Sequence, residues 1–263
     1  MTNSDVTRIA LAQSAADLNC AAEDFLSSEN KTVISKANPS ARKYLKLPFC
    51  LNLVSYGGNI VASASGEVIG IAEKYINSFS AEHCFETPQL FILDEYLKPL
   101  GKRICYMAEY FLPDLDKLQN FGCGYELRIL QPEELRNLYT EEWSHALCKE
   151  RKELDVLAVG AYDKGKLIGL AGCSADCDTM WQIGINVLPE YRRQGVASAL
   201  TSKIANETLA RGKVPFYCAA WANIKSVKNA LKCGFYPAWT ELTAADNETV
   251  NKLLINYARR NIQ

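Results

Sequence analysis

The residues whose chemistry can be interpreted most directly lie in the segment MWQIGINVLPEYRRQGVASAL, residues 180–200. A basic turn, Arg192–Gln194, is followed by Gly195 and Ala197, and from there a helix is expected to run to about Ala210. The first turn of a helix carries unpaired backbone N–H groups and a partial positive charge, and both favour a phosphate. Gly195 and Ala197 have no bulky side chain, so a ligand can approach the backbone closely. The segment is therefore a candidate phosphate site.

Taken alone, this turn has a second interpretation, as an ordinary connection between a strand and a helix with a solvated basic surface. It matches neither of the common nucleotide-binding motifs. It lacks the Lys-Ser/Thr pair of a P-loop, and it has no three-glycine dinucleotide fingerprint. The turn alone therefore does not distinguish a phosphate site from an ordinary connection.

Two motifs follow one another in the second half of the chain. The first is Val187-x-Pro189-x-Tyr191 joined to Arg192-x-x-Gly195-x-Ala197. The second is Asn223-x-x-Ser226, followed by a helix that ends in Lys232-Cys233-Gly234-Phe235. The pair resembles the acetyl-CoA pyrophosphate loop and the last conserved helix of the GNAT superfamily of N-acetyltransferases. The resemblance extends over residues 121–243.

The resemblance implies where acetyl-CoA, as cosubstrate, would bind. The pantetheine arm would pair like an extra strand along residues 185–187, with the backbone N–H of Val187 facing the thioester carbonyl. The pyrophosphate would lie on the backbone N–H groups of residues 193–198. The side chain of Asn223 would contact the arm, and Ser226 would lie near the phosphates. The implied cofactor-binding residues are Ile185, Asn186, Val187, Arg192, Arg193, Gln194, Gly195, Val196, Ala197, Ser198, Asn223 and Ser226.

The general acid is where the sequence departs from the family. Many members have a tyrosine a few residues before the Gly-Phe pair, placed to protonate the leaving thiolate. The equivalent position here is Ala230, which has no hydroxyl. Tyr217 and Tyr236 are possible substitutes, and the alternative is that both are core or rim tyrosines. A CoA thiolate is a fairly good leaving group, so the departure weakens the resemblance without removing it.

The sequence does not identify the general base either. A free amine of the lysine type has a pKa near ~10.4 and arrives mostly protonated, so a carboxylate would help. Glu142 is the candidate, beside Glu141 and His145 in Glu-Glu-Trp-Ser-His, where a helix would put Glu141 and His145 on one face. The alternative is an exposed ion pair next to a packing tryptophan. Asp178 is a weaker candidate, and Gln182 cannot act as a base.

The cysteines do not indicate a metal site. Cys173 and Cys177 have a spacing compatible with a zinc pair, but no second pair follows closely. We interpret both as small core residues, like Cys218 and Cys233. No metal ion is expected.

Composition narrows the function classes. The chain has 263 residues, of which 48% are hydrophobic, and its formal charge is −1. No run of Lys or Arg is longer than two, so neither a nucleic acid nor an anionic membrane is expected as a partner. Ten scattered cysteines, no signal-peptide pattern and no apolar stretch of membrane-spanning length favour a reduced, cytoplasmic protein.

The order of elements predicts an α+β protein of two domains. We expect an α+β domain of unknown role at residues 1–120, with helix over 4–40, a hairpin over 46–65 and a helix near 67–77. A degenerate GNAT-like half is one alternative for it. Residues 121–263 are expected to form a GNAT-like catalytic domain with a mixed, mostly antiparallel sheet flanked by helices. Helices are expected from Pro132 to about Arg151.

These observations lead to two hypotheses of different class. The first is an acetyl-CoA-dependent N-acetyltransferase that transfers the acetyl group directly to a primary amine of a small molecule or peptide. The second is a non-catalytic acyl-CoA-binding sensor module. The sequence indicates neither the acceptor nor the oligomeric state.

Overall fold

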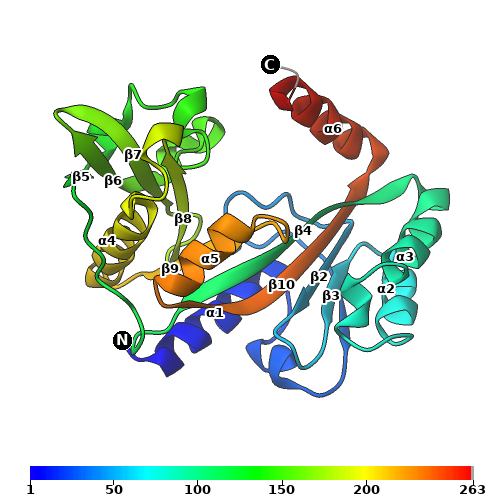
Figure 1. Ribbon diagram of the computed structural model, residues 1–263. Helices are drawn as coiled ribbons and strands as arrows, with labels where there is room; N and C mark the ends of the chain where they lie inside the picture. Colours follow the sequence, from blue (N-terminus) through cyan, green and yellow to red (C-terminus); the bar gives the residue numbers. More distant parts are fainter. Residues whose placement is uncertain (262–263) are drawn as a thin grey trace. The chain divides into compact units, whose positions relative to one another are not determined.

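The computed structural model describes the backbone of residues 1–261 and the side chains of residues 1–255. The chain forms two compact units, each built from two separate segments (Figure 1). Unit 1 combines residues 1–10 with residues 110–238. Unit 2 combines residues 11–109 with a C-terminal segment that begins at Trp239. Among the described residues no helix is long and apolar enough to cross a membrane.

Helices and strands alternate along much of the chain. The α-helices are α1 (Asn3–Leu18), α2 (Ile69–Ile76), α3 (Gln89–Leu97), α4 (Val196–Ala210), α5 (Ile224–Lys232) and α6 (Asn247–Asn261). The strands are β1 (Lys31–Ile34), β2 (Leu51–Ser55), β3 (Val61–Ala64), β4 (Lys102–Pro113), β5 (Glu126–Leu130), β6 (Asp155–Asp163), β7 (Lys166–Ser174), β8 (Met180–Val187), β9 (Val214–Ala219) and β10 (Phe235–Asp246). Short 3-10 helices are η1 (Ala22–Leu26), η2 (His83–Phe85), η3 (Lys98–Leu100), η4 (Pro132–Leu135), η5 (Glu141–Trp143), η6 (Lys149–Leu154) and η7 (Pro189–Tyr191).

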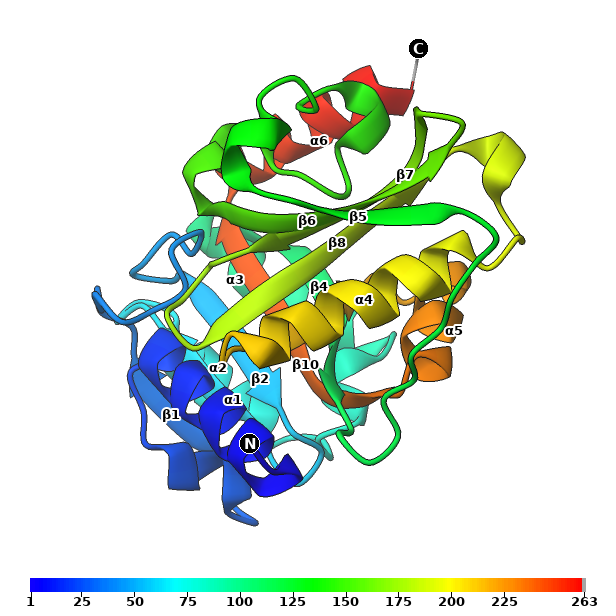
Figure 2. The same ribbon diagram turned by 90° about the vertical axis from the view of Figure 1, so that its left-hand side faces the viewer.

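Unit 1 is built on a sheet in which neighbouring strands follow the order β10-β4-β9-β8-β7-β6-β5. Strands β5 to β8 pair antiparallel in succession, whereas β8 and β9 are parallel. Figure 2 shows α4 running along β8, with α5 beside it. The sheet of this unit is therefore mixed and mostly antiparallel, with helices against it, as predicted.

Both faces of the unit 1 sheet are buried. One face forms an apolar core with α4 and α5, which includes Leu157, Ile183 and Leu200. Against the other face lies the irregular segment between β5 and β6, whose Trp143 and Leu147 pack on Leu170. The irregular segment and the two helices therefore cover opposite faces of β7 and β8.

Unit 2 has a smaller sheet in the order β1-β3-β2-β10-β4. Strands β2 and β3 form the predicted hairpin, and β10 pairs antiparallel with β2 from Thr240 to Ala244. One face packs on α2 and α3 through an apolar core that includes Tyr75, Leu93 and Leu242. The α+β class predicted for the N-terminal region is therefore confirmed. Its origin as a degenerate GNAT-like half stays a prediction.

The two compact units differ from the two continuous segments expected from the sequence, 1–120 and 121–263. Strands β4 and β10 each contribute residues to both units. The cause is long-range pairing of β10 with β2, because a strand that joins another sheet carries its chain segment with it. The assignment of 1–120 and 121–263 as separate domains stays a prediction.

Two helical predictions were too long. Residues 4–40 contain α1, η1 and strand β1 instead of one continuous helical region. Ser14 lies inside α1, and its hydroxyl is 2.8 Å from the Tyr56 hydroxyl. Between Pro132 and Arg151 the chain forms short 3-10 turns, because Trp143 and Leu147 turn into the core while their polar neighbours stay exposed.

A buried cluster of charges joins distant parts of unit 2. The Arg42 guanidinium donates to the carboxylates of Asp17 in α1 and Glu241 in β10. The exposed fractions are 4% for Arg42, 0% for Asp17 and 2% for Glu241. The Trp239 indole N–H also donates to Glu241, at 2.8 Å. One cation therefore compensates two carboxylates that are shielded from water.

Replacing this cation should destabilise the protein strongly. In Arg42→Met two buried carboxylates lose their partner, and breaking such a pair costs about 3–5 kcal/mol. The matched control is Arg8→Met, because Arg8 pairs with Asp5 on the surface and its side chain is 71% exposed. An exposed pair contributes about 0.2–1 kcal/mol. Urea unfolding at pH 7 measures both, and equal losses for the two variants would contradict the importance of the buried cluster.

Candidate functional site

The basic turn connects β8 to α4 in unit 1. After β8 ends at Val187 the chain forms η7, and Gly195 then caps α4 with φ +82°. Such a positive φ suits glycine, because other residues carry a Cβ that clashes there. A Cβ placed on Gly169 of β7 would lie 2.9 Å from a methyl of Val196, so the absence of a side chain there lets α4 begin close to the sheet. The turn is thus held close to β7.

The backbone N–H groups of this turn are available. Ala199 donates to the Gly195 carbonyl at 3.0 Å, which begins the helical pattern. For the amides of residues 193–198, the described part of the chain supplies no hydrogen-bond acceptor. A Cβ on Gly195 would have no atom within 4 Å, so the space beside it is open. Free amides at a helix N-terminus with open space are the donor set that a phosphate requires.

Side chains around the turn hold its shape. The Tyr125 hydroxyl donates to the side-chain oxygen of Gln194, and Gln194 in turn donates to the Glu190 carbonyl at 3.0 Å. Tyr191 packs edge-on against Tyr125, with 5.6 Å between ring centroids. Arg192 donates from Nε to the Val187 carbonyl at 3.0 Å, and Arg193 is exposed. Of these residues, Tyr125 had no role in the sequence-based site.

Strand β8 continues beyond its pairing with β9. The register runs from Met180 opposite Val214 to Ile183 opposite Tyr217. The Leu188 N–H donates to Ile168 of β7 at 3.0 Å. Backbone groups alternate between the two edges of a strand, so those of Ile185 and Val187 point to the edge away from β7. This is the edge along which residues 185–187 were expected to pair with a pantetheine arm.

The second motif begins α5. Asn223 caps this helix, because its side-chain oxygen accepts from the Ser226 N–H at 3.3 Å. The Ser226 hydroxyl lies 2.7 Å from the hydroxyl of Tyr217 in β9. Ser198 of α4 donates its hydroxyl to Asn229 at 3.1 Å, which ties α4 to α5. The side-chain oxygen of Asn223, expected on the cofactor arm, is thus already used as a cap.

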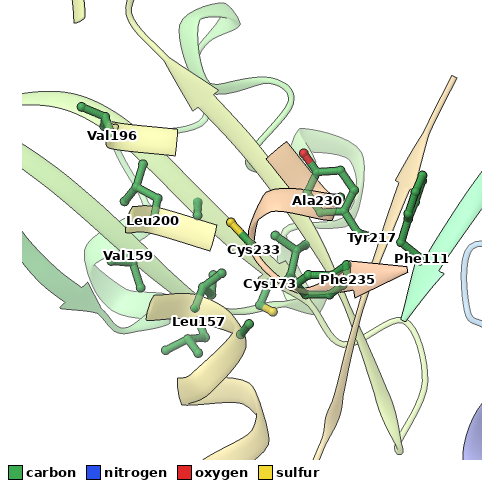
Figure 3. Close-up of a cluster of buried hydrophobic side chains, with 14 of the residues drawn as sticks. Phe111, Leu157, Val159, Cys173, Val196, Leu200, Tyr217, Ala230, Cys233 and Phe235 are labelled. Carbon is green, nitrogen blue, oxygen red and sulfur yellow. The ribbon is translucent and has the colours of Figure 1, made fainter. Parts of the chain in front are cut away.

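The two candidate tyrosines lie in different surroundings. Tyr217 belongs to the buried cluster beneath α5, together with Ala230 and Phe235 (Figure 3). Burial raises the pKa of the Tyr217 phenol, so this group stays protonated. Tyr236 is 36% exposed and follows Phe235 in β10, so its side chain points to the opposite face. The structure brings Tyr217, but not Tyr236, together with Ser226.

The candidate bases do not share a helical face. Glu142 is exposed in η5, which spans only Glu141–Trp143, so the expected spacing of Glu141 and His145 on one helix was wrong. The Asn186 side-chain oxygen accepts the backbone N–H groups of His145 and Ala146, both at 2.8 Å. Asp178 precedes β8, whose eight residues Met180–Val187 span roughly 26 Å. It is therefore far from the edge near Val187.

The cysteines expected in the core are mostly buried. Cys173 and Cys177 are 0% and 3% exposed, Cys233 is 0% exposed, and Cys218 is half-buried. The thiol of Cys173 lies 3.2 Å from the Thr208 hydroxyl, and that of Cys218 accepts from Gln182 at 3.0 Å. Among the described side chains no three His, Cys, Asp or Glu residues are placed to hold a metal ion.

With the sheet, the turn and the α5 motif in place, comparison with known proteins defines the class. Residues 124–235 match the model of the acetyltransferase (GNAT) family. The chain therefore contains a GNAT acetyltransferase domain in its C-terminal half, with additional structure N-terminal to it. A search among curated proteins found no match.

Solved structures similar to this chain include several acetyltransferases. A GNAT-family acetyltransferase from Colwellia psychrerythraea is 14% identical, with a TM-score of 0.46, over 93% of this chain and 97% of that one. A GNAT-family protein from Novosphingobium aromaticivorans is 21% identical, with a TM-score of 0.40, over 55% of this chain and 66% of that one. Aminoglycoside N-acetyltransferase AAC(6')-Iy in complex with CoA is 22% identical, with a TM-score of 0.35, over 46% and 93%. The chain spans about two thirds of the Novosphingobium protein.

The segment that carries Glu142 is fixed at its far end by a buried carboxylate. Asp155, at the start of β6, accepts the Cys148 N–H at 3.0 Å and is 3% exposed. Burial raises the pKa of Asp155 to about 6, against an ordinary 3.8. The folded state therefore binds a proton here more tightly than the unfolded state.

This pKa predicts how stability changes with pH. The contribution of Asp155 is fully present below pH 3.8 and is lost as pH rises through about 6. Asp155→Asn stays neutral, so the free energy of unfolding of this variant relative to wild type should rise between pH 4 and pH 7. The rise is at most about 3 kcal/mol, from about 1.4 kcal/mol per pKa unit. Urea unfolding across this range measures it, and a flat difference would contradict the assignment.

Proposed function

We propose that the protein is an acetyl-CoA-dependent N-acetyltransferase that transfers an acetyl group directly to a primary amine. The observation that carries the proposal is a path in unit 1 with two sets of free donors. One set lies at the edge of β8 beyond Ile183, and the other comprises the amides of residues 193–198. Between them the amides of Leu188, Tyr191 and Arg192 are bonded within the protein. The path lies within the GNAT domain and has the two parts that a pantetheine arm and a pyrophosphate need.

The residues present fit acetyl-CoA at this path. The backbone of Ile185 and Val187 would hold the pantetheine arm, and the N–H of Val187 would polarise the thioester carbonyl. The amides of residues 193–198 would hold the pyrophosphate, with Arg192 and Arg193 adding positive charge. Acetyl-CoA supplies the activated acetyl group. We retain Gln194, Val196, Ala197, Ser198 and Asn223 in the proposed site for their backbone or side-chain donors.

Tyr217 is the proposed acid. Its hydroxyl is within hydrogen-bond distance of Ser226, at the start of α5, and its ring belongs to the cluster that contains Ala230. Alanine at 230 leaves space against α5 that the ring of Tyr217 can use. A hydroxyl carried by β9 would then protonate the leaving thiolate in place of one carried by α5. Tyr236 is retained as the alternative acid.

Glu142 is the proposed base. It is exposed on the segment that covers the second face of the sheet, where a carboxylate can take a proton from an ammonium group directly or through water. The acceptor is proposed to be a primary amine of a small molecule or a peptide. AAC(6')-Iy, by its name, acetylates aminoglycosides, and an aminoglycoside is therefore one acceptor to include in a test.

Two measurements test the proposal. Calorimetric titration measures the binding of acetyl-CoA. An assay of free CoA thiol then measures transfer to four amines: kanamycin, spermidine, a peptide with a free N-terminus and a lysine-containing peptide. Gly195→Glu should weaken acetyl-CoA binding at least tenfold, because it places a carboxylate beside the amides that hold the pyrophosphate. Gly195→Gln is the matched control for size and for the positive φ of this position, and it should retain more affinity. Equal affinity of Gly195→Glu and wild type would refute the site.

These two measurements also separate the enzyme from the alternative of an acyl-CoA sensor module. Binding together with thiol release on one class of amine establishes the enzyme and its acceptor. Binding without release on any of the four amines would favour the sensor. Absence of binding would mean that the turn is only a connection between β8 and α4.

The role of Tyr217 can be tested against that of Tyr236. Tyr217→Phe should lower kcat about tenfold or more with little change in acetyl-CoA affinity, because general acid catalysis contributes typically 10²–10⁴-fold and a CoA thiolate needs less help than most leaving groups. Tyr236→Phe is the comparison. Tyr236 faces away from the cluster that contains Tyr217 and Phe235, so the kcat of this variant should stay close to that of wild type. A loss of kcat in Tyr236→Phe but not in Tyr217→Phe would contradict the assignment and indicate Tyr236 as the acid.

A further inference from the structure

Two glycines of the unit 1 sheet form a platform for a backbone segment. Gly172 of β7 and Gly184 of β8 are direct partners in the antiparallel register. A Cβ on Gly184 would lie 2.1 Å from the carbonyl oxygen of His145, and a Cβ on Gly172 would lie 2.1 Å from that of Ala146. Real Cβ atoms do not approach this closely, so any side chain at either position would displace the segment. The backbone of His145 and Ala146 therefore lies directly on the sheet.

Asn186 fastens the same segment. It lies two residues after Gly184, and residues two apart in a strand face the same side of the sheet. Its side-chain oxygen accepts the N–H groups of both His145 and Ala146, each at 2.8 Å. The burial of Trp143 and Leu147, 4% exposed each, anchors the segment on both sides of these bonds. The Ala146 N–H is shared with the Trp143 carbonyl at 2.9 Å, whereas the His145 N–H depends on Asn186. A single amide oxygen thus contacts two consecutive donors of a segment that forms no regular helix.

We infer that Asn186 is a positioning residue for acetyl transfer, which fixes the acceptor-side segment Glu141–Leu147 to the strand that holds the donor. The inference rests on the proposed function and deepens it. The backbone groups of Ile185 and Val187, which flank Asn186, point to the edge proposed for the pantetheine arm. The Asn186 side chain, from the same stretch of β8, holds the segment that presents Glu142 and His145. One short stretch of strand therefore sets the donor and the acceptor side together.

This arrangement defines a distinct role for Asn186. The proposed cofactor contacts of residues 185–187 are made by backbone, so a change of the Asn186 side chain should leave acetyl-CoA affinity almost unaltered. It should instead alter the placement of the segment that meets the amine. Asn186 would therefore act on kcat/KM for the amine, whereas a cofactor ligand would act on the dissociation constant for acetyl-CoA.

The test compares Asn186→Leu with Asn186→Asp. Leucine is similar in size but has no acceptor, whereas aspartate keeps an oxygen for the two N–H groups. In Asn186→Leu, hydrogen exchange at the amide of His145 should accelerate at least tenfold, and kcat/KM for the amine of the four that releases thiol fastest should fall at least tenfold. The amide of Ala146 keeps the Trp143 carbonyl as acceptor and should change less. Acetyl-CoA affinity should stay within threefold. Asn186→Asp should restore exchange protection and most of the kcat/KM.

Gly184→Ala provides a second variant if leucine at 186 prevents folding. Its added methyl should displace the segment and release the amide of His145, whereas Gly124→Ala, where a Cβ meets no atom within 4 Å, should leave the exchange of this amide unchanged. Unchanged exchange in both Asn186→Leu and Gly184→Ala would overturn the inference. So would a loss of acetyl-CoA affinity in Asn186→Leu as large as its loss of kcat/KM. Failure of wild type to bind acetyl-CoA would instead refute the proposed function, and the exchange rates would still decide how the segment is held.

Discussion

The arrangement of the site depends on where the hydrogen bonding between β8 and β9 stops. The register ends at Ile183 and Tyr217, while β8 continues to Val187. An unpaired strand edge is a template for another extended chain, which is usually a liability for a protein. Here the edge leads directly to the turn before α4, whose amides are also unpaired within the described chain. The N–H groups of Ile185 and Val187 and those of residues 193–198 are therefore two sets of free donors, one on the strand edge and one on the turn. The Val187 carbonyl accepts from Arg192, which holds the turn against the end of β8.

Packing on the opposite side keeps this edge extended. Strand β8 pairs with β7 up to Val187, and α4 covers one face of both strands. The other face is occupied by the segment around His145 and Ala146, bonded to Asn186. Because three sides of β8 are held, its fourth side can stay free of partners without the strand losing its shape. A rigid strand loses little conformational entropy when a ligand pairs with it.

The sequence predicted the parts of the site that are local in the chain. The strand over residues 180–187, the turn and the helix after Gly195 follow from alternation, proline and glycine, which act over a few residues. Asn223 was expected on the cofactor arm, and its role as the cap of α5 was not predicted, although this contact is also local in the chain. The pairing of β10 with β2 was not predictable in this way, because nothing in either strand specifies a partner some 190 residues away. For the same reason the sequence did not indicate that residues from Trp239 onward join unit 2.

The segment between β5 and β6 was misjudged for a different physical reason. Pro132 is a typical first residue of a helix, and Glu141 and His145 have helical spacing. The chain instead turns so that Trp143 and Leu147 reach the core and its backbone meets the sheet. A signal for this was present in the sequence. Gly172 and Gly184 lie within strands, where glycine often marks the close approach of another backbone.

The two glycines reduce the stability of the strands in exchange for this contact. Glycine in the interior of a strand costs stability, because it loses more conformational freedom on folding and offers no side chain to pack. At Gly172 and Gly184 the missing side-chain volume is filled by the carbonyl groups of His145 and Ala146. Their N–H groups are bonded to Asn186, and that of Ala146 also to the Trp143 carbonyl, so neither donor is without a partner. A larger residue at either glycine would favour the strand conformation, but it would displace the segment that lies on the sheet. The presence of glycine at these two positions of β7 and β8 is therefore explained by the segment that lies on the sheet, and not by the stability of the strands alone.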